Sequence, residues 1–246
     1  MKAIILCAGQ GRRLLPYTES TPKCLLKLAD KHFIEWQIDT LKAAGIEQIV
    51  AVIGYAAEDI RTLLSQRYGD SVTTVFNPFY EVADNLASCW MAREHFNDDV
   101  IILNGDTLFE ADVVHQLLTK NDFPITLAID HKASYDDDDM KVISQDDQLL
   151  AVGKTLAVAQ VTGESIGMMH FSPIGIHHFK ATIDALMHDQ DSLQRWYLSV
   201  IDQLAQQDHV GVCSIHGCAW TEVDFVQDLE HAQSLVAQWQ HADQDR

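Results

Sequence analysis

A short apolar run that ends in a glycine turn and leads into fixed positive charge constrains this chain most. Residues 3–7 are apolar, and such a run, ended by glycine, is typical of a buried strand. The small residues that follow let the backbone bend sharply and approach a ligand closely. Backbone N–H groups at a turn can bind an anion, and arginine or lysine adds charge-assisted hydrogen bonds. The stretch therefore predicts a phosphate site at Leu6, Ala8, Gly9, Gly11, Arg12, Arg13 and Lys23.

Two common phosphate-binding signatures are absent from this stretch. The dinucleotide fingerprint G-x-G-x-x-G needs a third glycine, but its position is held by Leu14. A Walker A loop needs G-K-[ST], and no such string follows. The two glycines alone are therefore explained equally well by a tight turn without a ligand.

The order of the apolar segments predicts an α/β fold. Strands and helices alternate over about the first 80 residues, which indicates a parallel sheet with helices on both faces and ligands at the carboxyl ends of its strands. With no linker, repeat or low-complexity block, we expect one Rossmann-like domain over residues 1–246, with a mixed but mostly parallel sheet. The expected strands are 3–7, 46–53, 72–76, 100–103, 125–129 and 210–215, with a hairpin over 141–152; the expected helices are 31–44, 57–68, 85–95, 112–119, 173–188, 191–206 and 228–239.

Composition limits the partners. A chain of 246 residues that is 47% hydrophobic can bury a sizeable core. The net charge of −19 argues against a nucleic acid, which needs a basic face, but leaves nucleotides open. No apolar run is long enough for membrane insertion, and no signal peptide is visible. Five cysteines without paired spacing indicate reduced thiols and a cytoplasmic location. A homo-oligomer is compatible with the sequence.

One single aspartate and one run of four aspartates stand out further along. Asp106 follows an apolar strand, where a doubly wound fold places its chemistry, although Asn104-Gly105-Asp106 is also ordinary turn composition. Four aspartates at 136–139 contain D-x-D, a pattern that would suggest Mn²⁺ in a glycosyltransferase. Because no apolar strand leads directly into them, and because four like charges repel each other, we interpret them as a solvated loop.

A longer string that contains the glycine turn resembles the signature of the nucleotidyltransferases that activate sugar phosphates and alcohol phosphates. The string is A-G-x-G-x-R-L-x-P-x-T-x-x-x-P-K-x-L-L over residues 8–26; it departs where the sugar-directed members often have Thr and this chain has Arg12. The resemblance implies a GT-A-like fold in which Arg13 and the loop amides take the β- and γ-phosphates and Lys23 reaches the α-phosphate. The strings L-x-G-D and W-x-E-V-D resemble the family's metal site, which implies Mg²⁺ on Asp106 and Asp224.

Other segments resemble the phosphocholine and phosphonate cytidylyltransferase branch. The helix that starts near Asn85 and carries Ser88 resembles the part that contacts base and ribose, while a plain helix cap is the alternative for Asn85. The order M-K-V, G-K, G-E-x-I-G matches the same branch and implies that Lys154 holds the acceptor phosphate. The implied catalytic residues are Lys23, Arg13 and Lys154, and the implied acceptor-binding residues are Trp90, Lys154, Glu164, Trp220 and Glu222.

We therefore expect an enzyme that transfers CMP from CTP to a small alcohol phosphate or phosphonate and releases pyrophosphate. Trp90 and Trp220 could face a quaternary ammonium of the acceptor through cation–π contacts. The alternative enzyme is a sugar-1-phosphate nucleotidyltransferase that uses UTP or dTTP. A glycosyltransferase would share the nucleotide-binding half but release no pyrophosphate. An inactive regulatory domain would lose Lys23 or the metal carboxylates, and this chain retains them.

Overall fold

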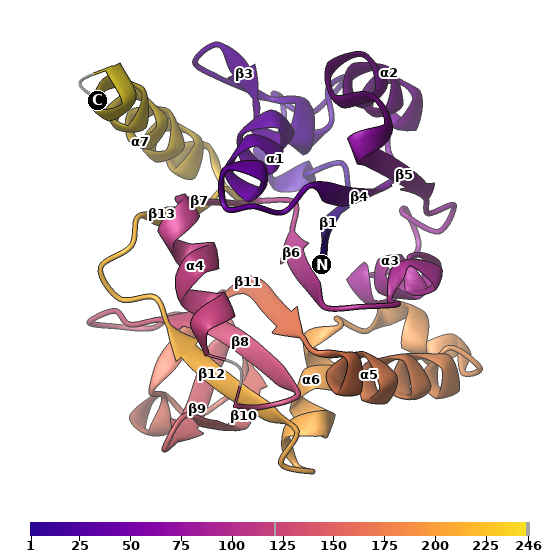
Figure 1. Cartoon of the computed structure of the whole chain (residues 1–246), viewed down its shortest axis with the longest axis vertical. Coiled ribbons are helices and arrows are strands. Elements are labelled where there is room, and N and C mark those ends of the chain that lie inside the picture. The colour runs from indigo at the N-terminus through magenta and orange to yellow at the C-terminus, as the bar shows by residue number, and fades with distance from the viewer. Residues whose placement is uncertain (121, 245–246) are drawn as a thin grey trace.

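A nine-stranded mixed sheet forms the centre of the molecule (Figure 1). The computed structural model describes residues 1–120 and 122–244. Only β11 and β10 run against the other strands of this sheet. In spatial order the strands are β5 (Val72–Phe76), β4 (Gln48–Ile53), β1 (Lys2–Cys7), β6 (Val100–Asn104), β11 (Gly163–Phe171), β8 (Ile125–Asp130), β12 (Val210–Ser214), β10 (Gln148–Gly153) and β9 (Lys141–Gln145).

Helices cover both faces of the sheet. Successive side chains of a strand point to opposite faces, so Ile4 of β1 joins one apolar cluster and Ile5 joins the other. The first cluster is completed by α3 (Asn85–Met91), α5 (Pro173–Leu186) and α6 (Leu198–Ala205), of which α5 and α6 lie side by side in Figure 1. The second is completed by α1 (Phe33–Ala43), α2 (Ala57–Tyr68) and α4 (Ala111–Thr119).

Short elements attach the C-terminal part of the chain beside the sheet. β13 (Trp220–Glu222) pairs antiparallel with β7 (Thr107–Phe109), so that Glu222 lies opposite Thr107. Val223 is fully buried in a third apolar cluster with α7 (Val226–Gln244). β2 (Lys27–Leu28) and β3 (Lys31–His32) form a further small hairpin, and 3₁₀ turns occupy Arg12–Leu14, Lys23–Leu25, Gly69–Ser71, Arg93–His95, Val158–Gln160 and Gln190–Gln194.

The predicted α/β class and the mixed, helix-flanked sheet are confirmed, with two local corrections. The helix expected over 191–206 is interrupted, because the chain docks on the start of α3: the Asp84 amide donates to the Leu193 carbonyl at 2.7 Å and the Leu86 amide to the Arg195 carbonyl at 3.3 Å. The helix expected over 85–95 ends at Met91 and continues as a 3₁₀ turn. The single-domain boundary over 1–246 stays a prediction.

The aspartate run at 136–139 divides into two parts. Asp136, Asp137 and Asp138 are exposed, as predicted for a solvated loop. Asp139 turns inward instead, and its carboxylate accepts a hydrogen bond from the Lys132 ammonium at 2.6 Å. Burial alone would raise the pKa of Asp139, but Lys132 and the Asp136 amide outweigh burial and lower it. The last aspartate thus belongs to the packed edge of the sheet.

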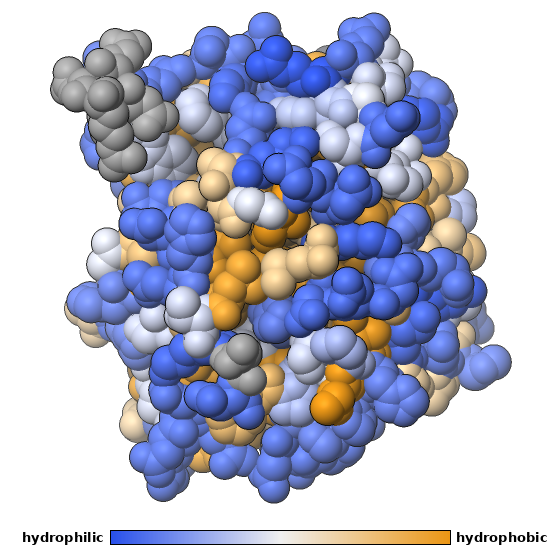
Figure 2. All heavy atoms as spheres, in the orientation of Figure 1, coloured by the Kyte–Doolittle hydropathy of each residue, from blue (hydrophilic) through white to orange (hydrophobic). Residues whose placement is uncertain are grey.

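The face in Figure 2 is mainly hydrophilic, with apolar atoms visible in its middle, which fits the net charge of −19. Within residues 1–120 and 122–244, no helix combines the length and the apolar character needed to cross a membrane.

Replacing Gly167 should destabilise the centre of the sheet. Gly167 has a φ of +72°, and an added Cβ would lie 2.4 Å from Nδ2 of Asn104. We expect Gly167→Ala to lower the free energy of unfolding by about 1–3 kcal/mol, from backbone strain and this clash. Gly153→Ala is the control, since an added Cβ there meets no atom within 4 Å. Urea denaturation measures both, and equal midpoints for the two variants would contradict the expectation.

Candidate active site

A cavity of about 410 Å³ opens where β1 and β6 end. It lies at the carboxyl edge of parallel strands, where doubly wound sheets bind their ligands. All residues predicted to bind nucleotide line this one cavity: Leu6, Ala8, Gly9, Gly11, Arg12, Arg13, Lys23, Asn85, Ser88 and Asp106. Asp224, predicted as a metal ligand, lines it too. The structure thus brings together segments that are up to 218 residues apart (224 − 6).

The glycine turn is shaped by its contact with Lys23. Gly11 is left-handed, with a φ of +80°, and a Cβ there would lie 2.8 Å from Cβ of Lys23. The Thr18 hydroxyl donates to the Gly11 carbonyl at 2.7 Å, and the Lys23 amide donates to the Gln10 carbonyl at 3.3 Å. By contrast, the space over Gly9 is open to 4 Å. Gly11 is therefore required by the fold, whereas Gly9 leaves room for a ligand to approach the backbone.

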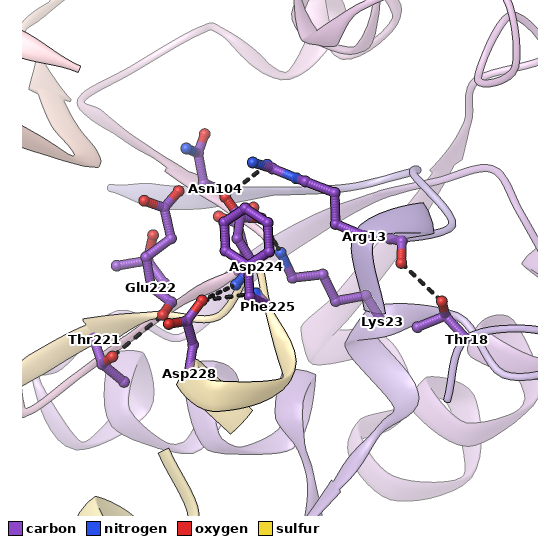
Figure 3. A network of polar contacts seen from close by, with 12 residues as sticks. Arg13, Thr18, Lys23, Asn104, Thr221, Glu222, Asp224, Phe225 and Asp228 are labelled. Atoms are coloured by element: carbon purple, nitrogen blue, oxygen red, sulfur yellow. Dashed lines mark hydrogen bonds and ion pairs between the residues drawn. The ribbon is translucent and has the colours of Figure 1, made fainter. Parts of the chain in front are cut away.

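Lys23 lies between two carboxylates at the base of the cavity. Its Nζ is 3.1 Å from Oδ2 of Asp106 and 2.8 Å from Oδ1 of Asp224. Arg13 reaches the other oxygen of Asp224 at 2.6 Å, as Figure 3 shows, and its guanidinium lies 5.2 Å from the centre of the Phe225 ring. Burial alone would lower the pKa of Lys23, but the charges of Asp106 and Asp224 outweigh it and raise that pKa. The ammonium is therefore held in its charged form.

Three carboxylates converge beside this lysine. Oxygens of Asp106, Glu222 and Asp224 lie within 4.8 Å of one another. Burial around the Glu222 carboxylate, with the charges of Asp106 and Asp224, raises the pKa of Glu222 to about 8, although part of its side chain stays exposed. Oδ1 of Asp106 is buried and lacks a hydrogen-bond partner within the described part of the chain. Clustered hard oxygens with an unsatisfied buried atom are suited to a divalent cation.

The start of α3 forms the opposite wall of the cavity. Hydrogen bonds with residues of other elements hold this wall in place. The Asn85 side chain accepts a hydrogen bond from the Tyr197 amide at 2.9 Å, so the alternative reading of Asn85 as the helix cap is wrong: Asp84 precedes the helix. Ser88 accepts from Nδ2 of Asn77 at 3.0 Å. The buried Tyr197 hydroxyl donates to Asn104 at 3.2 Å. Both predicted residues of this wall are thus held in place by partners from other elements.

The structure does not bring the predicted acceptor-binding residues into this cavity. Trp90 donates from Nε1 to Asp184 at 3.1 Å, and Arg93 covers its ring at 4.0 Å from the centre. Trp220 donates from Nε1 to Asp130 at 2.7 Å and packs against the apolar cluster of the second sheet face. Neither indole lines the cavity, and the role of each in acceptor binding stays a prediction. Glu222 lies with the metal-type carboxylates instead.

Lys154 and Glu164 lie at the neighbouring end of β10 and β11, outside the lining of the cavity. The Lys154 ammonium lies 5.0 Å from the centre of the Trp196 ring and 3.6 Å from Asp138. Glu164 accepts from the Lys132 ammonium at 2.9 Å. The helical spacing of residues 191–206 had indicated core packing for Trp196, but its side chain is 42% exposed. This tryptophan therefore offers an accessible ring beside a predicted acceptor-binding residue.

Some lining residues were missed by sequence reasoning. Asn77 and Asn104 line the cavity, and both stand at or just after the end of a strand. The rule that identified Asp106 could have identified them as well. Tyr80, Ala83 and Asp84 also line the cavity, and their loop carries no sequence signal of this kind.

A helix-flanked mixed sheet with a charged cavity at its carboxyl edge is the arrangement of α/β nucleotide-binding proteins. More specifically, the chain belongs to the family of MobA-like NTP transferase domains, whose family model matches residues 3–160. The predicted resemblance to nucleotidyltransferases is thereby confirmed.

Three individual proteins show what the chain is similar to. The chain is 41% identical to the choline-phosphate cytidylyltransferase of Streptococcus pneumoniae over 110 residues, which is 45% of this chain and 47% of that relative. It is 25% identical to the CTP:phosphoglutamine cytidylyltransferase of Campylobacter jejuni over 256 residues, which is 94% of this chain and 98% of the relative. The inositol-1-phosphate CTP transferase from T. maritima has the same fold, with a TM-score of 0.81 at 19% identity over 95% of this chain and 94% of the other.

Proposed function

We propose that this protein transfers CMP from CTP to a small alcohol phosphate or phosphonate and releases pyrophosphate. The observation that carries the proposal is the placement of Lys23 between Asp106 and Asp224, under a glycine turn and inside one cavity. The cytidylyltransferases among the relatives support CTP as the nucleotide. Their acceptors differ, so the acceptor is proposed only as a class.

The chemistry requires positive charge rather than a protein nucleophile. An oxygen of the acceptor phosphate attacks the α-phosphorus of CTP, and the bond to the pyrophosphate oxygen breaks. Both reactants are anionic, so the site must neutralise charge and hold the groups in line. Arg13 and the amides near Gly9 and Gly11 would bind the β- and γ-phosphates. Lys23 would contact the α-phosphate and the leaving oxygen.

The carboxylates fit a magnesium ion. Asp106 and Asp224 would hold it, and a bound Mg²⁺ supplies positive charge to phosphate oxygens. The buried, unpaired Oδ1 of Asp106 and the nearby Asp224 provide the hard oxygen ligands that Mg²⁺ prefers. Lys23 already lies against both carboxylates, so it must share them with an arriving cation.

The acceptor side extends from the cavity toward Trp196. Asp84 lines the cavity; burial raises its pKa, and the nearby Trp196 side chain partly offsets that shift. Asp84 thus lies near the exposed indole of Trp196, over which the Lys154 ammonium lies. Trp196 is exposed, whereas Trp90 and Trp220 are half-buried, so Trp196 replaces them in the proposal as the aromatic face for a cationic acceptor group. The Lys154 ammonium lies over the same ring and would leave it for the acceptor phosphate.

A pyrophosphate assay tests the nucleotide and the acceptor class together. CTP, UTP, dTTP and ATP are each combined with phosphocholine, 2-aminoethylphosphonate or glucose-1-phosphate in the presence of Mg²⁺. We expect release only with CTP and the first two acceptors. Lys23→Ala should slow it roughly a hundredfold or more, as for other donors of transition-state charge. Lys120→Ala, which removes an exposed ion pair with Asp147, is the control. Release with UTP or dTTP and glucose-1-phosphate would select the sugar-directed alternative.

Removing Lys23 should strengthen Mg²⁺ binding by the protein without nucleotide. The ammonium neutralises Asp106 and Asp224 in this state, so Lys23→Met leaves a more negative site that attracts the cation more strongly. Isothermal titration calorimetry with MgCl₂ should give a lower Kd for Lys23→Met than for wild type. Lys120→Met should bind like wild type, and an unchanged Kd for Lys23→Met would remove these carboxylates from the metal assignment.

Matched substitutions can show whether Trp196 or Trp90 faces the acceptor. Trp196→Leu should raise the KM for phosphocholine about two- to thirtyfold, the range of a cation–π contact, and leave the KM for CTP unchanged. Trp90→Leu should leave both KM values unchanged, because its ring contacts Arg93 and Asp184 instead. The opposite pattern in steady-state kinetics would restore Trp90 as the acceptor platform.

A further inference from the structure

A fully buried lysine lies between the two residues that sequence reasoning assigned to the acceptor. Lys141, the first residue of β9, is 2% exposed. It pairs in register with Gly153 of β10 on one side and with Glu164 of β11 on the other. Lys154 directly follows Gly153. Lys141 therefore lies next to both Glu164 and Gly153, the residue that precedes Lys154.

The ammonium of Lys141 has an unusual set of contacts. Its Nζ donates a hydrogen bond to the Lys154 carbonyl at 2.8 Å. Across residues 1–120 and 122–244, no carboxylate lies within 4.0 Å of it. Burying an ammonium costs several kcal/mol even after relaxation, so an apolar side chain would serve a strand interior better. We therefore explain the lysine at this position by the hydrogen bond that its ammonium donates to the Lys154 carbonyl.

The contact lies just beyond the end of the strand ladder. The register of β10 with β9 ends at Gly153 and Lys141, so Lys154 is no longer held by a paired strand. The side chain of Lys141 continues the attachment by one residue, through the Lys154 carbonyl. This fixes the backbone from which the Lys154 side chain extends to Trp196 and Asp138.

We propose that Lys141 is a positioning residue for the acceptor side of the site. It holds the backbone of Lys154 and, through the shared register, keeps Lys154 and Glu164 at a fixed separation. The inference rests on the proposed function, because it treats Lys154 as the ligand of the acceptor phosphate. In this proposal Lys141 controls acceptor binding but does not itself contact CTP.

The kinetic test compares Lys141→Met with wild type. The substitution keeps an unbranched side chain of similar length but removes the charged donor. We expect the KM for phosphocholine to rise about tenfold, the typical worth of a hydrogen bond to a charged group, with the KM for CTP and kcat within about twofold. Lys120→Met is the matched control on an exposed ion pair and should change nothing. An unchanged KM for phosphocholine in Lys141→Met would overturn the inference, whatever the value of kcat.

A second readout does not depend on activity. The reactivity of the Lys154 amine toward an acetylating N-hydroxysuccinimide ester, measured by mass spectrometry, should increase severalfold in Lys141→Met because the side chain leaves Trp196. Unchanged reactivity would overturn the positioning role even if the wild-type protein transferred CMP to no acceptor, so the two failures are distinguishable. Lys141→Gln, which keeps a polar end but is too short to reach the carbonyl, should behave in the same way and replaces Lys141→Met if that variant does not fold.

Discussion

The contact of Lys23 with Asp106 and Asp224 is the interaction on which the rest of the site depends. The three residues come from a 3₁₀ turn, the end of β6 and the segment after β13, and only the assembled sheet brings them together. Three carboxylates this close repel one another, and this repulsion adds to burial in raising the pKa of Glu222. The buried ammonium offsets part of that repulsion, and Arg13 adds a second cation on Asp224. In the proposed reaction, phosphates that draw these two cations away would leave the negative charge of the cluster free to bind a divalent cation.

The architecture separates the two halves of the proposed reaction. Parallel strands β1 and β6 end at the glycine turn and Asp106, which form the nucleotide side. β11 is inserted antiparallel next to β6, so its first residues, not its last, reach the same edge. Glu164 is therefore presented beside the ends of β8 and β10, where Lys132, Lys141 and Lys154 gather. A reversal of one central strand thus places a separate set of charges beside the nucleotide cavity.

Much of the nucleotide side was predictable because its residues obey local rules. Strand ends and glycine turns mark Gly11 and Asp106, and the cavity contains both. Asp224 could be predicted only from the family resemblance, since its position depends on the pairing of β13 with β7. The acceptor side depends on contacts that local rules do not predict: helical spacing cannot show that Trp196 lies where the helix breaks, or that Trp90 is covered by Arg93. Lys141 was marked only as part of the M-K-V string of the family resemblance. No local rule predicted its burial, because a lysine in a hairpin is usually exposed.

The central claim is that the charge cluster around Lys23 receives the nucleotide triphosphate together with a cation. A crystal structure of the protein with CTP and Mg²⁺ tests it most directly. The account predicts a triphosphate lying over Gly9 and Gly11, an Mg²⁺ bound by oxygens of Asp106 and Asp224 at about 2.0–2.1 Å, and Lys23 shifted from the carboxylates toward a phosphate oxygen. A triphosphate bound elsewhere, or Lys23 still bridging Asp106 and Asp224 with no cation beside them, would contradict it.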